Sequence, residues 1–182
     1  MDVERRVNLA YSAFGRLNKA IWKNAQISLG LKVRLYNALI VPIATYACET
    51  WTLKESDAQK LLVFEMKCLR AILGVTLYNR LKNQDIRQRL NVKKTIVDNI
   101  RSRRMKWFGH VNRRDRDSLV YRAYSQSFPN PRPAGRPPKR WTDQIRADTG
   151  LPLQTAERNT MDREMWRNRL RTRARDQTDV CY

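Results

Sequence analysis

Residues 55–74 read ESDAQKLLVFEMKCLRAILG, and this stretch decides the class of fold. Its apolar side chains recur at steps of three and four residues, the spacing that places them on one face of a helix. The first set is Leu62, Met66, Leu69 and Leu73, and a second set, Leu61, Phe64, Cys68 and Ile72, widens the same face. So broad an apolar face indicates burial between other helices.

Local signals define the two ends of this helix. Ser56 and Gln59 have the spacing of a capping box, in which the two side chains satisfy backbone N–H groups of the first turn. Gly74 is a natural stop, because glycine adopts the left-handed conformation that commonly follows a helix. The sequence therefore predicts a helix that begins at Ser56 and ends at Gly74.

Two more helices are predicted before this one. In residues 2–25 the apolar stripe is Val3, Val7, Ala10, Phe14, Leu17 and Ile21. Ser28 is suited to cap a second helix, whose apolar positions are Leu31, Leu35, Leu39 and Ile43. Pro42 should kink or end that helix, because a proline inside a helix removes a backbone donor and clashes with the preceding turn.

Three helices are predicted between residues 80 and 126. A short one covers about Gln84 to Leu90, and another short one starts at Ser118 and runs through Tyr124. A longer helix covers about Thr95 to His110, with Ile96, Ile100, Trp107 and Val111 on its inner face.

The C-terminal part begins with a proline-rich stretch at residues 128–138, which favours an extended chain over a helix. Beyond it, Trp141 and Ile145 fit a short helix that ends near Gly150. A last helix is predicted over about residues 155–175, with Met161, Met165, Trp166 and Leu170 on its apolar seam.

The fold class predicted from these patterns is all-α: a multi-helical bundle with a proline-rich linker and a C-terminal helical extension. No stretch predicts a strand. We expect four segments: a helical bundle at 1–75, a basic helical region at 76–127, a proline-rich basic linker at 128–140, and a C-terminal helical segment at 141–182.

Charge is the unusual feature of the composition. The 182 residues include 37 Lys or Arg and 17 Asp or Glu, a formal net charge of +20. Self-repulsion on this scale favours a polyanionic partner, with nucleic acid as the first candidate and an anionic membrane surface as the second.

No membrane-spanning segment and no signal peptide is visible. The three cysteines, Cys48, Cys68 and Cys181, form no close pair, which favours a reducing, intracellular compartment.

Residue types needed for catalysis or metal binding are poorly represented. His110 is the single histidine, and a packing or helix-end role is favoured for it over general-base catalysis. A zinc site is disfavoured because the cysteines and His110 are isolated from one another. The six glycines are scattered and form no phosphate-binding loop. We therefore expect no catalytic residue, no metal ligand and no cofactor.

The basic segment from Arg80 to Arg116 is the strongest functional signal, with thirteen Lys or Arg against three Asp. The predicted phosphate contacts are Arg87, Arg89, Lys93, Lys94, Arg101, Arg103, Arg104 and Lys106. The alternative is that these cations only form a solvated face. Trp107, Phe108, Tyr121 and Tyr124 lie among the charges and could stack on bases, although for Trp107 a core position is preferred.

A second basic signal is the stretch GRPPKR at residues 135–140. An extended Gly-Arg-Pro segment can insert an arginine into a narrow minor groove, as the core of an AT-hook does. Arg136, Lys139 and Arg140 are therefore added to the predicted nucleic-acid contacts. Ala134 stands where an AT-hook has a basic residue, so a plain linker with incidental charge stays open as the alternative.

Several phrases, taken in order, resemble the region after the palm of non-LTR (LINE-type) retrotransposon reverse transcriptases, with RTE- and BovB-like elements nearest. The phrases are RRV (5–7), AFGRL (13–17), KVRLY (32–36), YACETW (46–51), FEMKCLR (64–70), ILG (72–74), RMKWFGHV (104–111), GRPPKRW (135–141) and DREMWR (162–167). Each phrase is weak alone, but together they cover most of the chain from residue 3 to about residue 170.

The resemblance implies a helical thumb at residues 1–75, followed by basic helices that face RNA, DNA or an RNA–DNA hybrid. The family's polymerase chemistry uses palm aspartates and magnesium, and no Asp-Asp pair occurs here. The family's endonuclease domain and zinc knuckle are also missing. The resemblance therefore implies a non-catalytic fragment, from a truncated element or gene, that works in the nucleus or cytoplasm. The missing palm and fingers of the parent polymerase are possible partners.

Two other readings stay open at this point. The chain could be a helical protein-interaction module whose apolar stripe in residues 2–25 needs a partner. It could also be a relic of a retroelement without present function.

Overall fold

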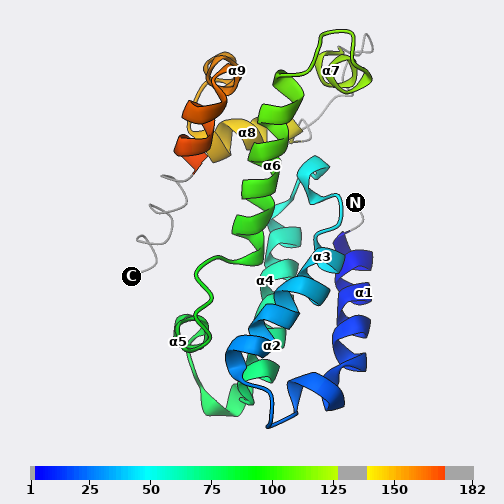
Figure 1. Ribbon diagram of the computed structural model, residues 1–182, viewed down its shortest axis with the longest axis vertical. Coiled ribbons are helices and arrows are strands. Elements are labelled where there is room, and N and C mark those ends of the chain that lie inside the picture. The colour runs from blue at the N-terminus through cyan, green and yellow to red at the C-terminus, as the bar shows by residue number, and fades with distance from the viewer. Residues whose placement is uncertain (1–2, 127–138, 171–182) are drawn as a thin grey trace. The chain divides into compact units, whose positions relative to one another are not determined.

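The computed structural model describes residues 3–126 and 139–170, and helices make up most of both ranges (Figure 1). No strand occurs among the described residues, so the predicted all-α class is confirmed. None of the described helices combines the length and the apolar character that crossing a bilayer requires. The proline-rich stretch at 128–138 and the predicted helix beyond residue 170 lie outside the described residues.

The chain forms two compact units. Unit 1 consists of Met1–Cys48 and Leu53–Ile100, and unit 2 consists of Glu49–Thr52 and Arg101–Tyr182. A four-residue strip of the N-terminal half therefore belongs to unit 2. The domain borders predicted near residues 75, 127 and 140 do not coincide with these limits, and they stay a prediction.

The helices of unit 1 are α1 (Val3–Arg16), α2 (Leu29–Leu35), α3 (Val41–Ala44), α4 (Glu55–Leu73), α5 (Asn83–Arg89) and the first residues of α6 (Ile96–Asn112). Two π-helical turns, Asn18–Trp22 and Tyr36–Ile40, and the 3-10 turn Leu77–Asn79 complete the described elements of unit 1, and a second 3-10 turn, Cys48–Thr50, spans the border between the units. Unit 2 contains the rest of α6, α7 (Leu119–Ser125), α8 (Trp141–Thr149), α9 (Leu153–Met161) and a helix at 163–170.

Helix α4 provides the centre of unit 1, as its wide apolar face predicts. Leu61, Phe64 and Leu69 are fully buried, and α1 packs against both α3 and α4 (Figure 1). The ring of Tyr11 on α1 meets Phe64 edge-on at 4.7 Å between centroids. Gly74 ends the helix with a positive φ of 76°, which confirms the predicted stop.

The start of α4 differs from the prediction. The N-cap residue is Lys54, which makes no side-chain capping bond, so Ser56 lies inside the first turn and forms no capping box. Trp51 and Leu53 are buried just before the helix, and the N-cap of the helix lies two residues earlier than expected. Glu55 and Asp57 then lie in the first turn, where acidic side chains interact favourably with the helix dipole.

The predicted inner face of the second helix is wrong by one residue. Ser28 caps α2 as expected, through a 3.3 Å bond from the Leu31 N–H to its Oγ. The buried positions, however, are Lys32, Tyr36, Ile40 and Ala44, whereas Leu31 and Leu39 are exposed. A π-helical turn at Tyr36–Ile40 widens the helix to more than four residues per turn. In a regular α-helix, positions four residues apart drift slowly around the axis, and the wider turn reverses that drift, so Lys32, Tyr36, Ile40 and Ala44 stay on the buried face.

The first predicted helix also changes course earlier than expected. Val3, Val7, Ala10 and Phe14 are buried as predicted, but α1 ends at Arg16. The chain then turns so that Trp22 stacks on Phe14, with ring centroids 4.6 Å apart, and donates its indole N–H to the Phe14 carbonyl at 2.8 Å. Trp22 thus takes the inner position that the stripe assigned to Ile21.

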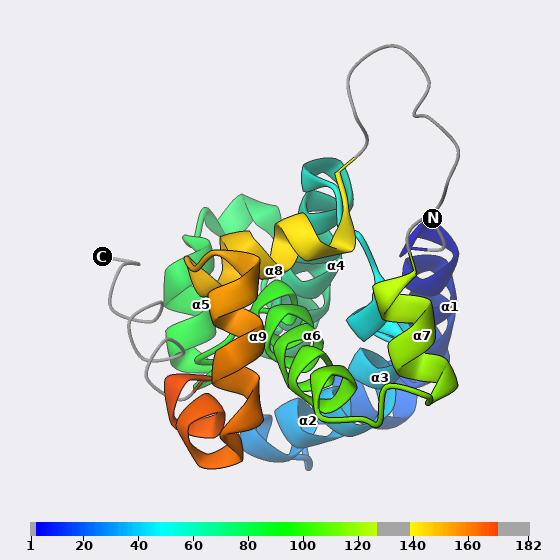
Figure 2. The same ribbon diagram turned by 90° about the horizontal axis from the view of Figure 1, so that it is seen from above.

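Five aromatic and aliphatic side chains form the core of unit 2: Met105, Phe108, Ile145, Ala156 and Trp166. In Figures 1 and 2, α8 and α9 lie beside the part of α6 that supplies Met105 and Phe108. Ser118 caps α7, and Gly150 ends α8 with a φ of 67°; both were predicted from sequence.

The last predicted helix is interrupted, so the prediction of one continuous helix from residue 155 is wrong. α9 ends at Met161, and the Asp162 side chain accepts the backbone N–H groups of Glu164 and Met165, each at 2.9 Å. These bonds begin a new helix at residue 163. The change of direction places Trp166 in the core and leaves Met161 and Met165 exposed.

The buried thiols of unit 1 give a first testable prediction. Cys48 and Cys68 are buried, and burial, followed by the charge of Glu65, raises the pKa of Cys68 to about 12. Because the thiolate is the reactive form, Cys68 in a Cys181→Ser background should react with iodoacetamide at pH 8 roughly a thousandfold more slowly than an ordinary thiol. Mass spectrometry of the alkylated peptides measures this rate, with urea-unfolded protein as the control. Equal rates in folded and unfolded protein would contradict the burial of Cys68.

Candidate nucleic-acid interface

Helix α6 carries most of the predicted site, and the four residues Trp107 to His110 have four different environments. Phe108 is fully buried in the core of unit 2. Gly109 lies against Trp166, so closely that a Cβ added there would be 2.6 Å from the indole nitrogen. Trp107 is only half-buried and His110 is exposed. Trp107 is therefore not the core anchor predicted from sequence, because the inner face of α6 passes through Arg104 and Phe108 instead.

Arg104 is committed to the interior of unit 2. Its side chain is 3% exposed and pairs with Asp148 of α8, with its Nε 2.9 Å from Oδ2. Arg101, which is half-exposed on α6, approaches the other carboxylate oxygen of Asp148 at 3.8 Å. Because Arg104 is buried and bound to Asp148, its guanidinium holds α8 against α6, and we withdraw it as a candidate phosphate contact.

Arg87 in unit 1 also forms an ion pair with a buried carboxylate. Its Nη2 is 2.7 Å from Oε2 of Glu65, a buried carboxylate on α4. The other oxygen of Glu65 accepts the backbone N–H of Ile96 at 2.8 Å, where α6 begins. Burial raises the pKa of Glu65 above its usual value, although Arg87 and the Ile96 N–H act in the opposite direction. Arg87 therefore compensates a buried charge and is also withdrawn.

The remaining predicted cations are exposed and fall into two separate groups. Arg89, Lys93 and Lys94 belong to unit 1, on and after α5. Arg101, Arg103, Lys106, Lys139 and Arg140 belong to unit 2. Arg140 precedes α8 and donates its backbone N–H to Asp143 at 2.8 Å. Arg136 lies outside the described residues.

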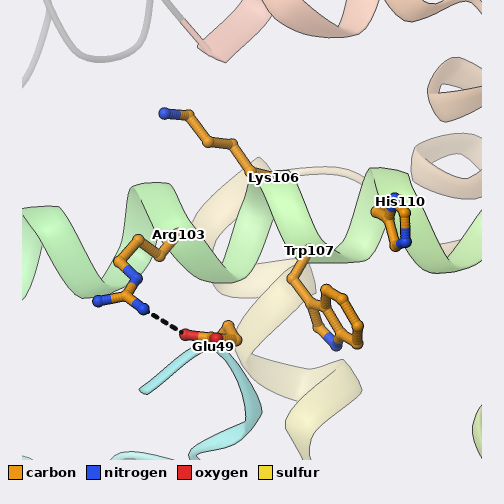
Figure 3. A pocket seen from close by; sticks show the side chains of 5 residues that line it. All are labelled: Glu49, Arg103, Lys106, Trp107 and His110. Carbon is orange, nitrogen blue, oxygen red and sulfur yellow. Dashed lines mark ion pairs between the residues drawn. The ribbon is translucent and has the colours of Figure 1, made fainter. Parts of the chain in front are cut away.

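A surface hollow of about 340 Å³ adjoins the cations on α6. Its lining residues are Glu49, Arg103, Lys106, Trp107 and His110, all in unit 2 (Figure 3). Arg103 pairs with Glu49 at 3.1 Å, and the indole of Trp107 stacks on the His110 ring at 5.2 Å between centroids. The hollow thus combines an aromatic wall with two cations and one carboxylate.

Two contacts fix the ends of this hollow. The backbone carbonyl of Glu49 accepts the indole N–H of Trp141 at 2.8 Å, which ties the strip Glu49–Thr52 to α8. His110 Nε2 accepts a 3.1 Å bond from Nε of Arg114, which lies just beyond the C-terminal end of α6.

Sequence reasoning missed Glu49 and Arg114 as parts of the site. Arg114 follows His110 by four residues and could have been found from helical spacing. Glu49 lies 54 positions before Arg103, and no periodic signal connects a short turn to a distant helix.

Comparisons with known proteins give one relevant likeness. The chain is 27% identical over 154 residues to an uncharacterized transposon-derived protein of Caenorhabditis elegans. The match covers 81% of this chain and 53% of that protein, so the chain spans about half the length of the curated relative. No family model matches the chain, and no solved structure matches it.

Proposed function

We propose that this chain is a nucleic-acid-binding piece of a non-LTR retrotransposon reverse transcriptase, which holds RNA, DNA or an RNA–DNA hybrid through the phosphate backbone. The proposal is carried by the exposed cations Arg101, Arg103 and Lys106 on one helix beside an aromatic hollow. The likeness to a transposon-derived protein supports a transposon origin, and the sequence phrases support the finer assignment to a reverse transcriptase thumb and the region after it.

The proposed role is supporting and not catalytic. Polymerase chemistry and its magnesium ions would belong to the palm of the parent protein, and the chain's own part is to grip the backbone of the bound nucleic acid. Phosphates carry no base identity, so the contacts from α6 give affinity without sequence choice. The proposed setting is intracellular, in the nucleus or the cytoplasm.

The first test is a matched pair of double variants in the full chain. Arg103→Gln with Lys106→Gln should lower affinity for duplex DNA roughly tenfold at moderate salt, because each lost phosphate contact removes about 0.9 from the slope of log affinity against log salt. Arg158→Gln with Arg167→Gln removes the same charge from exposed positions elsewhere in unit 2 and should have little effect. Fluorescence anisotropy across a salt series measures both affinity and slope.

The outcome of this comparison separates the proposal from its rivals. Equal losses in the two double variants would mean that net charge acts without an organised site. A third double variant, Lys93→Gln with Lys94→Gln, reports whether the cations of unit 1 also contact the backbone. If the unaltered chain binds no nucleic acid near physiological salt, the proposed function fails, and the relic reading takes its place.

A protein-interaction role is the second candidate, favoured by exposed leucines on one segment. The predicted stripe of α1 is buried inside unit 1 and needs no partner. Leu29, Leu31 and Leu39, in contrast, are 38–44% exposed along α2 and the π-helical turn after it. Sedimentation equilibrium tests this candidate, because a partner-binding surface of this kind should cause self-association that Leu31→Gln with Leu39→Gln abolishes.

A further inference from the structure

The hollow on α6 has the features of a site for a single unpaired base. Its volume of about 340 Å³ falls in the range of small-ligand pockets, although it is open to solvent on one side. Trp107 supplies a flat, half-buried aromatic wall, and the His110 ring stacks behind it at an interplanar angle of 23°. A base of any identity can stack on such a wall, because every base has a π-face.

The charges around the hollow are arranged unevenly. In Figure 3, Trp107 lies between the Arg103–Glu49 pair and His110. Lys106 extends from the other side of α6 and points away from Glu49. Lys106 has no ion-pair partner among the described residues and is exposed. A phosphate beside Lys106 would therefore be separated from the Glu49 carboxylate, whose charge is already compensated by Arg103 at 3.1 Å.

Helix α6 and the strip Glu49–Thr52 hold the two sides of the hollow around Trp107 in place. Phe108 and Gly109, which follow Trp107, are fixed in the core of unit 2. The Glu49 side of the hollow is fixed by the bond from Trp141 to its carbonyl. A preformed aromatic wall loses little conformational entropy when a ligand stacks on it.

We propose that Trp107 binds an unpaired nucleobase of single-stranded RNA or DNA by stacking, while Lys106 and Arg103 contact the adjoining phosphates. This inference rests on the proposed nucleic-acid binding and adds a preference to it. A base inside a duplex is stacked on both faces and cannot reach the indole, so the hollow discriminates single strands from duplexes.

The experiment compares a single-stranded 12-mer with the duplex of the same sequence, at fixed salt, in the full chain. Trp107→Ala should weaken single-strand binding about tenfold and leave duplex binding unchanged, because a base stacked on an aromatic ring loses its platform. Trp107→Phe keeps a ring and should retain most of the single-strand affinity. Circular dichroism confirms that each variant is folded.

A second ligand guards against indirect effects of the substitution. A 12-mer of abasic sites keeps the phosphates but has no bases, so Trp107→Ala should not change its affinity. Equal losses for the 12-mer, the duplex and the abasic strand, or no loss for any of them, would overturn the inference and leave backbone binding intact. Absence of binding to all three ligands by the unaltered chain would instead overturn the proposed function itself.

Discussion

Replacing Glu65 with alanine should lower the free energy of unfolding by about 3 kcal/mol, because breaking a buried ion pair leaves its other partner uncompensated. The change removes the carboxylate that Arg87 contacts at 2.7 Å and that receives the buried N–H of Ile96 at 2.8 Å. Arg87 is 22% exposed and regains some hydration, whereas the buried Ile96 N–H loses the acceptor that Glu65 provides. Urea unfolding followed by circular dichroism measures the loss.

Hydrogen exchange at Ile96 provides a local readout for the same variant. The amide of Ile96 should exchange faster in Glu65→Ala, since its acceptor has been removed. Arg87→Ala is the comparison, because it removes the ion pair but keeps the bond from Ile96 to Glu65. If Glu65→Ala is no less stable than the unaltered chain, or if Ile96 exchange is unchanged, the assigned geometry is wrong.

The same carboxylate makes a pH-dependent contribution whose sign follows from its raised pKa. Burial raises the pKa of Glu65 in the folded protein, so the folded state binds the proton more tightly than the unfolded state. The stabilising contribution of the protonated group is therefore lost as pH rises through the interval between the two pKa values. Glu65→Gln cannot titrate, and its stability relative to the unaltered chain should rise across that interval in urea unfolding at several pH values.

Replacing Gly109 with alanine should cost about 2 kcal/mol, the second large effect, because it overpacks the core of unit 2. A Cβ would lie 2.6 Å from Trp166 Nε1 and 2.8 Å from its Cδ1. Trp166 is buried and donates its N–H to the Met105 carbonyl at 3.2 Å, so the ring has little freedom to move away. The clash outweighs the gain of about 1 kcal/mol that alanine offers over glycine in a helix.

Gly15→Ala is the matched control for this substitution. Gly15 also lies inside a helix, α1, but an added Cβ would meet nothing within 4 Å. That variant should be as stable as the unaltered chain or slightly more stable. Equal urea midpoints for Gly109→Ala and Gly15→Ala would show that Trp166 does not pack against α6 as described.

Local chemistry explains which parts of the fold the sequence could predict. The caps at Ser28 and Ser118 and the stops at Gly74 and Gly150 depend on backbone groups within a few residues, and all four were found correctly. The inner face of α2 was missed because the π-helical turn that follows it changes the number of residues per turn. Likewise, the Asp162 side chain starts a new helix inside a pattern that reads as continuous.

The candidate site was harder to predict because arginines with different environments look alike in a sequence. Arg103 and Arg104 are neighbours, yet one lines an open hollow and the other is buried against Asp148. Their difference comes from where α8 packs, which helical spacing along α6 alone does not reveal. Trp107 and Phe108 show the same limit, since the sequence assigned the wrong one to the core.

The placement of Glu49–Thr52 in unit 2 has a consequence for the order of events during synthesis. All residues of unit 1 have been made once residue 100 has left the ribosome, whereas the backbone carbonyl of Glu49, in unit 2, must wait for Trp141. At a synthesis rate of about 5–20 residues per second, that delay is roughly 2–8 seconds. During this time α4 can already fold, while the strip Glu49–Thr52 still lacks its contact with Trp141. The nascent chain therefore passes through a stage in which unit 1 is complete and this strip is not yet packed.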